Sequence, residues 1–406
     1  MRGRSVAMRG SLAWIVTIGL AVGATGPAQA GPITSTDFYR EVPADLAPYA
    51  PGQVIRWEPE TDLGPKFVDL SAYRVMYRSD GFDGSATAEV AMVYIPDGTA
   101  PTGGWPLVVW AHGTSGVGDS CAPSLYPTLY PSPWPQYGNE VARLVRQGYV
   151  VAAPDYEGLG TPGPHPYLQT DTQAFATIDA ARAARELAAD VAGTEVGTRW
   201  AAIGHSQGGQ AAVGAAELAT SRAPELQMVG AVALAPSAML KRLMAPIAND
   251  PYGFPYVGYV AAGIAATHPG FDYAKFVGPQ LLPFMAYAEQ WCFDNWFPIT
   301  QAYLRPGARR NLATGWGADP DVKDYFRDAQ IGTRHADVPI LYLQGTVDGL
   351  YAVAPDQVAQ LCDQGDTVHL SAYPGLDHDP IVWKGWPESR AWLADRFAGL
   401  PAPDDC

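Results

Sequence analysis

Short apolar runs recur along the chain and predict the strands of a parallel sheet. Within each run the apolar residues are continuous rather than alternating with polar ones, as expected when helices cover both faces of a sheet. The runs are Pro106–Trp110, Tyr149–Ala153, Trp200–Ile203, Val229–Leu234, Pro339–Leu343 and Val368–Tyr373. Helical patterns lie between them, and the longest, Thr172–Ala192, is followed by Gly193, a typical C-cap residue. This alternation predicts a doubly wound, mostly parallel α/β sheet.

Two segments that precede these runs predict antiparallel strands. They are Tyr73–Tyr77 and Ala88–Ile95, and the second alternates between apolar and polar residues. Further upstream, Gly31–Thr61 is rich in proline and tyrosine and has little periodicity, so we expect an arm that wraps around the domain.

The alternation breaks once, where about a hundred residues separate Leu234 from Pro339. A single helix would suffice to connect two parallel strands, and this insertion is too apolar to be a linker. We expect residues 235–335 to form a mostly helical cap, with Lys323–Ala329 as one of its helices. The core then comprises 31–234 and 336–406. Ligands bind at the carboxyl edge of such sheets, so the cap is expected there. A packed subdomain without a role in binding is the alternative.

Residues 204–208 read Gly-His-Ser-Gln-Gly and carry the most specific signal for chemistry. They follow the apolar run Trp200–Ile203 and precede the alanine-rich segment Gln210–Thr220. A G-x-S-x-G motif between a strand and a helix is typical of a nucleophile elbow. Such a turn strains the serine backbone and exposes its hydroxyl, while the two glycines let strand and helix approach closely. Ser206 is therefore the predicted nucleophile.

A serine hydroxyl needs a base, and the base needs an acid that orients it. In elbow-containing sheets the chain order is serine, acid, histidine. Asp348 follows the run Pro339–Leu343, and His378 follows the last run, so we predict the triad Ser206, Asp348 and His378.

Other histidines and acids fit the triad less well. Asp356 is expected to cap a helix that starts near Gln357, and Asp363 and Asp366 are expected to be solvated near its end. Asp377 and Asp379 flank His378 too closely to orient its ring, but they can tune its pKa. His112 and His205 precede elements that do not supply the histidine of such a triad, and His369 lies inside a strand. The others lie outside the catalytic loops: His165, His268 and His335.

A serine that attacks a carbonyl group also needs donors for the negative charge that develops on the carbonyl oxygen. One expected donor is the amide of Gln207, directly after the nucleophile. The second is the amide of Thr114, in the glycine-containing loop 111–116 after the run Pro106–Trp110, and the Thr114 hydroxyl can add to it. An ordinary glycine turn is the alternative interpretation of that loop.

The N-terminal segment predicts export to an oxidising compartment. Arg2, Arg4 and Arg9 precede an apolar stretch too short to span a membrane, and Ala28-Gln29-Ala30 offers small residues for cleavage, so we expect an export signal over residues 1–30. Removing it changes the net charge from −15 to −18, which disfavours nucleic acid and anionic membranes as partners. We expect no integral membrane segment in the mature chain.

Four cysteines remain after cleavage, and an even number in an exported protein indicates two disulfides with three possible pairings. They are Cys121, Cys292, Cys362 and Cys406. No C-x-x-C motif or close Cys/His set points to zinc, so no metal site is expected.

With these motifs in order, the chain resembles the secretory lipase family of α/β-hydrolases, the group of Candida lipase A-like enzymes. The resemblance covers nearly the whole mature chain. The matching segments are 111–114, 120–124, 153–160, 204–209 and 345–348.

The resemblance implies an α/β-hydrolase fold, acyl-ester hydrolysis without a cofactor, a helical cap that shapes an acyl-binding tunnel, and the pairings Cys121–Cys292 and Cys362–Cys406. Several fungal members have glycine where this elbow has Gln207, whose side chain is expected to narrow or polarise the pocket.

The sequence thus predicts a secreted lipase or carboxylesterase that acts on small-molecule or lipid esters. We expect acylglycerol-type substrates and a transient contact with a lipid interface through the cap. A secreted serine exopeptidase of the same fold is one alternative. It would bind the substrate's α-amine through buried carboxylates, for which Glu289 and Asp294 are the candidates. A catalytically inactive binding protein is the other alternative.

Overall fold

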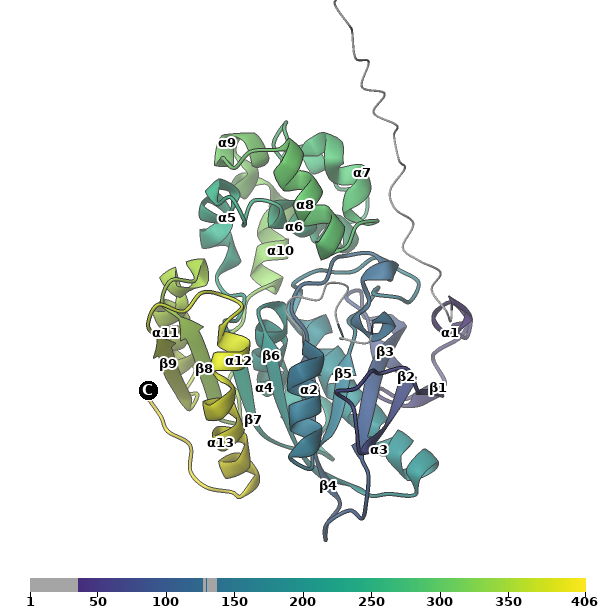
Figure 1. Ribbon diagram of the computed structural model, residues 1–406. Helices are drawn as coiled ribbons and strands as arrows, with labels where there is room; N and C mark the ends of the chain where they lie inside the picture. Colours follow the sequence, from purple (N-terminus) through teal and green to yellow (C-terminus); the bar gives the residue numbers. More distant parts are fainter. Residues whose placement is uncertain (1–35, 127–128, 130–136) are drawn as a thin grey trace, which may run out of the picture. The chain divides into compact units, whose positions relative to one another are not determined.

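The computed structural model describes residues 36–126, 129 and 137–406, so the predicted export signal lies outside the described residues. Nine strands form one sheet in the order β1-β2-β3-β5-β4-β6-β7-β8-β9, with β1 and β9 at its two edges (Figure 1). The strands are β1 Val54–Glu60, β2 Leu70–Asp80, β3 Ala86–Pro96, β4 Trp105–Ala111, β5 Val150–Pro154, β6 Val196–His205, β7 Gln227–Leu234, β8 Ile340–Gly345 and β9 Val368–Tyr373.

The sheet is parallel from β5 to β9 in this order and antiparallel in its first part. β4 pairs with β5 and β6, and β6 to β9 pair successively, all in parallel, whereas β1, β2 and β3 form an antiparallel meander that joins β5. All six parallel strands and both antiparallel strands lie where the apolar runs predicted them. The predicted arm was wrong in part, because Val54–Glu60 is a strand. As an edge strand it is only partly buried, so its sequence lacks a clear apolar face.

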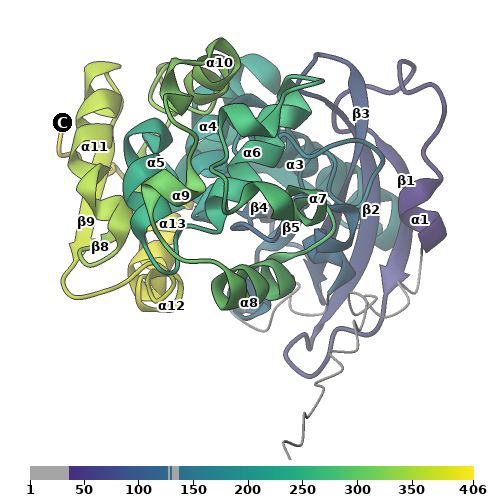
Figure 2. The same ribbon diagram turned by 90° about the horizontal axis from the view of Figure 1, so that it is seen from above.

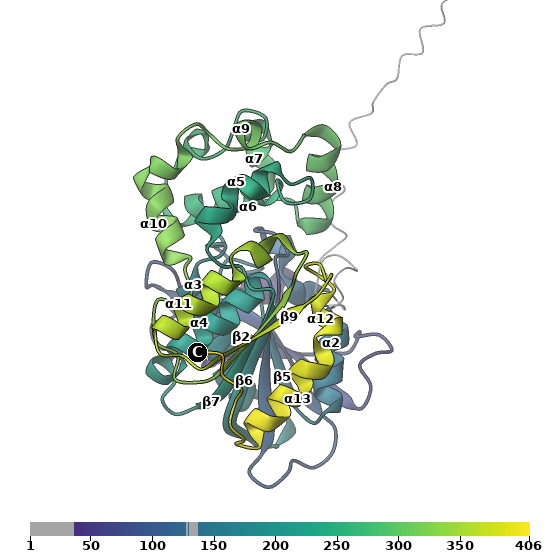
Figure 3. The same ribbon diagram turned by 90° about the vertical axis from the view of Figure 1, so that its left-hand side faces the viewer.

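Helices cover both faces of the sheet, which explains the continuous apolarity of the parallel strands (Figure 3). One face packs against α3 Thr170–Ala192, α4 Gln207–Arg222 and α11 Ala354–Asp363. The other packs against α2 Tyr137–Arg146, α12 Ile381–Lys384 and α13 Trp386–Phe397. Helix α3 ends as predicted at Gly193, which adopts a left-handed conformation with φ of 55°.

The chain between β7 and β8 folds into a cap with a hydrophobic core of its own. Seen from above, its helices lie over the strands (Figure 2). They are α5 Leu240–Asn249, α6 Tyr256–Thr267, α7 Met285–Ala288, α8 Phe293–Tyr303, α9 Ala308–Asn311 and α10 Pro320–Asp328. All of them fall within 235–335, the segment expected to be inserted. Asp319 is the N-cap of helix α10, and its carboxylate accepts hydrogen bonds from the amides of Asp321 and Val322.

Two disulfides join the pairs that the family resemblance implied. Cys121–Cys292 ties the loop after β4 to the start of α8 in the cap, and Cys362–Cys406 ties the chain end to α11. The tail lies along the edge strand β9, where the Asp405 amide donates to the Val368 carbonyl at 2.8 Å. The tail thus covers an edge that would otherwise expose unpaired backbone groups.

Among the helices of residues 36–126 and 137–406, none has the length and apolarity needed to cross a membrane.

Candidate active site

Ser206 occupies a sharp turn between β6 and α4. Its φ of 58° lies in the left-handed region, which is costly for a residue with a Cβ and is typical of functional positions. A Cβ on Gly204 would lie 2.1 Å from the Gly208 carbonyl oxygen, and a Cβ on Gly208 would lie 2.0 Å from that of Ala111. Only glycine fits at both positions, and their close packing holds the turn against the end of β4.

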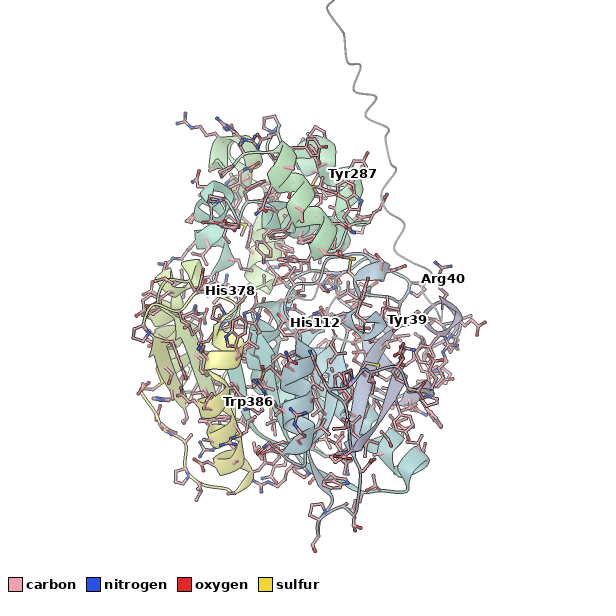
Figure 4. The ribbon with its side chains drawn as sticks, viewed as in Figure 1. Tyr39, Arg40, His112, Tyr287, His378 and Trp386 are labelled. Carbon is pink, nitrogen blue, oxygen red and sulfur yellow. A yellow bond between two sulfur atoms is a disulfide. The ribbon has the colours of Figure 1, made fainter. Side chains whose placement is uncertain are left out.

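The three residues of the predicted triad lie within hydrogen-bonding distance of one another. Ser206 Oγ is 3.0 Å from His378 Nε2, and His378 Nδ1 is 2.8 Å from Asp348 Oδ2. Each residue follows a different parallel strand, β6, β8 or β9, so all three lie at the carboxyl edge of the sheet. In Figure 4, His378 lies beneath the cap.

Asp348 is held as a buried carboxylate by hydrogen bonds to both oxygens. Its Oδ1 accepts from the Leu350 amide at 2.9 Å, and its Oδ2 accepts from Gln344 Nε2 at 2.6 Å as well as from His378. Burial alone would raise the pKa of Asp348, but the charge and hydrogen bond of His378, together with those of Leu350 and Gln344, lower it. The carboxylate therefore stays ionised and keeps the proton of His378 on Nδ1.

The electrostatic surroundings of His378 favour its charged form. Burial opposes protonation of the ring, but the Asp348 carboxylate, followed by Asp379 and Asp377, outweighs it and raises the pKa of His378 to about 9. Asp377 also accepts a hydrogen bond from the His378 amide at 2.8 Å. Both flanking aspartates thus contribute to the charge around the ring.

The predicted oxyanion donors lie on two segments that touch. The loop that begins at Ala111 packs against Gly208, and Gln207 is the first residue of α4, where a helix leaves its amide without an intrahelical acceptor. The Thr114 hydroxyl is 2.7 Å from the Tyr167 hydroxyl. Gln207 Nε2 lies 3.2 Å from His165 Nε2, while His165 Nδ1 donates to the Glu157 carbonyl at 2.7 Å. Because Nδ1 holds the proton, Nε2 accepts from Gln207 and fixes the orientation of its side chain.

A hydrogen-bond chain beneath the triad connects Tyr137 in α2 to the loop of His378. The Tyr137 hydroxyl lies 2.8 Å from His205 Nδ1. His205 Nε2 lies 3.2 Å from the His378 carbonyl oxygen, which can only accept. Burial lowers the pKa of His205 to about 4, so the ring is neutral, donates from Nε2 and accepts from Tyr137 at Nδ1. Each hydrogen bond of the chain therefore has one direction.

Several residues set aside in the sequence have other roles. His205 was set aside because it precedes the wrong element, but its ring lies 4.7 Å from that of His378 and forms a hydrogen bond with the His378 backbone. His165, expected to lie outside the catalytic loops, touches Gln207. No sequence signal would have identified these contacts or that of Tyr137, because they join segments far apart in the chain.

Two expectations about acidic residues near α11 were wrong. Asp356 lies within the first turn and not at the N-cap, and it forms an ion pair with Arg242 at 2.7 Å. Asp366 is buried and accepts hydrogen bonds from His335 Nδ1 and the Ala336 amide, both at 2.8 Å. Asp366 therefore fixes the segment that leads into β8, a role that helical periodicity does not show.

Over the described ranges, one group of three side chains has metal-ligand geometry: His205, His378 and Asp379. Both ring nitrogens of each histidine already have hydrogen-bond partners, so the group belongs to the site described above.

The cap brings aromatic side chains close to the site. The Phe293 amide at the start of α8 donates to the Ser115 carbonyl at 2.9 Å, which joins the cap to the loop that carries Thr114. Tyr256 contacts Phe297 at a ring distance of 4.7 Å. Burial raises the pKa of the Tyr256 hydroxyl, and the negative charges of Asp379 and Asp348 raise it further. The two carboxylates proposed for an α-amine, Glu289 and Asp294, are exposed on the cap, and Glu289 accepts a hydrogen bond from Tyr273.

The sequence pattern of secretory lipases matches residues 139–405, which include the elbow, the acid and the histidine. The chain belongs to the secretory lipase family. This secretory lipase has an α/β-hydrolase fold, as the resemblance implied, and the family and its relatives identify it as a carboxylic ester hydrolase of the lipase and esterase class.

Known relatives align with this secretory lipase over most of its length. Lipase A of Arthroderma benhamiae is 25% identical, with 93% of this chain and 83% of the relative covered. A "probable inactive lipase" of Mycobacterium tuberculosis is 26% identical, with 92% and 84% covered. The closed state of Candida antarctica lipase A has the same fold, with a TM-score of 0.74, 20% identity, and 89% and 85% of the two chains covered.

Proposed function

We propose that the protein is a secreted serine hydrolase that cleaves carboxylic esters, with acylglycerols as the substrate class, through a covalent acyl-enzyme. The observation that carries this proposal is the alignment of Ser206 Oγ, His378 and Asp348 at 3.0 and 2.8 Å. Export with cleavage of the signal near Ala30 is part of the proposal, and membership of a secretory family supports it.

The reaction proceeds in two halves. Ser206 Oγ attacks the ester carbonyl carbon while His378 Nε2 takes its proton, and Asp348 stabilises the resulting imidazolium. The amides of Thr114 and Gln207 donate to the oxyanion of the tetrahedral intermediate. His378 then protonates the departing alcohol. A water molecule, deprotonated by His378, attacks the acyl-Ser206 ester, and the collapse of this second intermediate releases the acid and restores the serine.

The raised pKa of His378 determines the pH at which this reaction runs. The ring must be neutral to accept the serine proton, so activity should rise as pH increases towards about 9. We therefore expect an alkaline enzyme.

Hydrolysis of p-nitrophenyl esters with acyl chains from C2 to C16 tests the proposal. The parent protein should cleave these esters, and Ser206→Ala should abolish cleavage and labelling by a fluorophosphonate. Undiminished activity in Ser206→Ala would refute the role of the serine. A folded parent that neither cleaves esters nor reacts with fluorophosphonate would place it with the inactive relative. Cleavage of amino-acyl amides without ester cleavage would instead support an exopeptidase.

A further inference from the structure

The charge of the protein is distributed very unevenly between cap and core. Segment 235–335 contains nine lysines and arginines and eight acidic residues, a net charge of +1. The mature chain as a whole carries −18, so the rest carries −19. The total charge argues against anionic surfaces as partners, but it does not describe the surface that the cap presents.

The positive charge of the cap is concentrated at one end, where two tyrosines are also exposed. We call this surface the cap tip and define it as Tyr252, Tyr303, Arg305, Arg309 and Arg310. Tyr252 and Tyr303 are 75% and 74% exposed, more than any other large hydrophobic residue of the described chain. All three arginines are exposed, and no described carboxylate lies within 4.0 Å of their guanidinium groups to form an ion pair.

Hydrogen bonds hold the two segments of the cap tip together. The Gly307 amide donates to the Ala248 carbonyl at 2.7 Å, and the Ala308 amide donates to Asn249 Oδ1 at 2.8 Å. Gln301 Nε2 donates to the Pro251 carbonyl at 3.1 Å. The turn that carries Tyr252 is thereby fixed beside the segment that carries Tyr303 and the arginines.

One acidic residue, Asp250, belongs to the turn that carries Tyr252. Together with the three arginines of the cap tip it gives a net charge of +2. Its Oδ1 accepts hydrogen bonds from the amides of Tyr252 and Gly253, at 2.8 and 2.7 Å, and so stabilises the turn. Asp250 therefore has a local partner of its own and does not pair with the arginines.

The acidic core lies too far away to cancel this charge. In Figures 1 and 3, α9 lies at the end of the cap that faces away from the sheet, with α5 and α6 between them. One helix with its side chains is about 10–12 Å across, whereas charges are screened over about 8 Å at physiological ionic strength. A surface that touches the cap tip is therefore attracted by the arginines more than it is repelled by the core.

From these observations we infer that the cap tip docks the protein onto lipid surfaces that carry anionic headgroups. Arginine guanidinium groups bind the phosphates, and tyrosine rings enter the headgroup region, where amphipathic aromatic side chains are favoured. The inference rests on the proposed function only in naming a lipid surface as the place where the substrate is found. It also differs from the expectation drawn from net charge, because local charge decides at such short range.

Vesicle flotation with the full mature chain tests the inference. The Ser206→Ala background prevents hydrolysis of the lipid, and vesicles contain phosphatidylcholine alone or mixed with phosphatidylglycerol. We expect the parent to bind the anionic vesicles more tightly. Arg305→Glu/Arg309→Glu/Arg310→Glu should weaken this binding by at least roughly a hundredfold, since the loss of each arginine near an anionic surface costs about fivefold and each glutamate adds repulsion.

A control with the same change in net charge separates the cap tip from the charge of the whole protein. Lys66→Glu/Arg146→Glu/Arg390→Glu reverses three exposed basic residues of the core and should leave vesicle binding within about twofold, because these residues do not face the membrane. Tyr252→Ser/Tyr303→Ser should weaken binding to both vesicle types, because it removes the aromatic contacts.

The outcomes distinguish this inference from the proposed function. Equal binding to both vesicle types, unchanged binding of the cap-tip triple variant, or equal losses in the two triple variants would refute the docking surface. With Ser206 present, the cap-tip variant should still hydrolyse short soluble esters at the parent rate. If the parent lacks ester hydrolysis but shows binding that depends on the cap tip, the proposed function is wrong and the docking surface stands.

Discussion

Replacement of His205 by phenylalanine is expected to slow ester hydrolysis although the residue is not part of the triad. His205 is buried beneath His378, donates to its carbonyl at 3.2 Å and accepts from Tyr137 at 2.8 Å. Phenylalanine fills the space but deprives the His378 carbonyl of the Nε2 donor and the Tyr137 hydroxyl of the Nδ1 acceptor that His205 supplies. Each such loss costs about 1–3 kcal/mol.

Part of this free-energy cost falls on the loop of His378, and that part determines how much the rate decreases. If about 1.4 kcal/mol of orienting free energy is lost, the fraction of molecules with His378 in hydrogen-bonding position falls about tenfold. We expect kcat on a soluble short-chain ester to fall about 10- to 100-fold with little change in KM, since His205 and Tyr137 are buried below the triad. Tyr137→Phe should show a smaller loss of the same kind.

Two comparisons separate positioning from general destabilisation. His205→Gln keeps an N–H that can reach the His378 carbonyl and should recover part of kcat. His335→Phe removes the 2.8 Å hydrogen bond to Asp366, before the amino end of β8, and should lower Tm without lowering kcat. The reasoning fails if His205→Phe keeps kcat within twofold of the parent, or if its loss appears wholly in KM.

Three further outcomes are expected. Asp348→Asn should keep the fold but reduce kcat about 10⁴-fold, because the ring loses the partner that holds its tautomer; a loss below tenfold in ester assays would contradict this. Asp379→Asn removes a negative charge that raises the pKa of His378, so the rising limb of the kcat/KM–pH profile should move to lower pH. If the limb does not move, Asp379 does not contribute to the raised pKa of His378. Glu217 is buried, and burial raises its pKa to about 7, so the folded state holds a proton that the unfolded state releases between pH 4.5 and 7. Stability from this group is therefore lost as pH rises through that range, and Glu217→Gln should raise the free energy of unfolding at pH 8 by up to about 3 kcal/mol but not at pH 4, as measured by urea denaturation.

The interior parallel strands of the sheet could be predicted because they are buried on both faces and are therefore largely apolar. The same reasoning failed at Val54–Glu60, because an edge strand is partly solvated and its residues need not be apolar. Helix α3 and its end at Gly193 were predictable from local backbone chemistry, since a left-handed residue there is best supplied by glycine. The N-cap of α11 was not predictable, because Val353 occupies it without a capping side chain.

The sequence by itself determined the order of the strands along the chain, the elbow at Ser206 and two later positions, Asp348 and His378, suited to join it. These features depend on periodicity and on the steric demands of a few adjacent residues, which are local properties.

Only the tertiary structure decided which distant groups meet. It joined Tyr137 to His205, oriented Gln207 through His165, and brought Tyr252 beside the arginines that follow Tyr303. Such contacts depend on how helices and strands pack, and packing is set by the shapes of many side chains together rather than by any short segment. The charge of the cap tip lies in one short segment, 305–310, but only the fold places it beside Tyr252 and away from the acidic core.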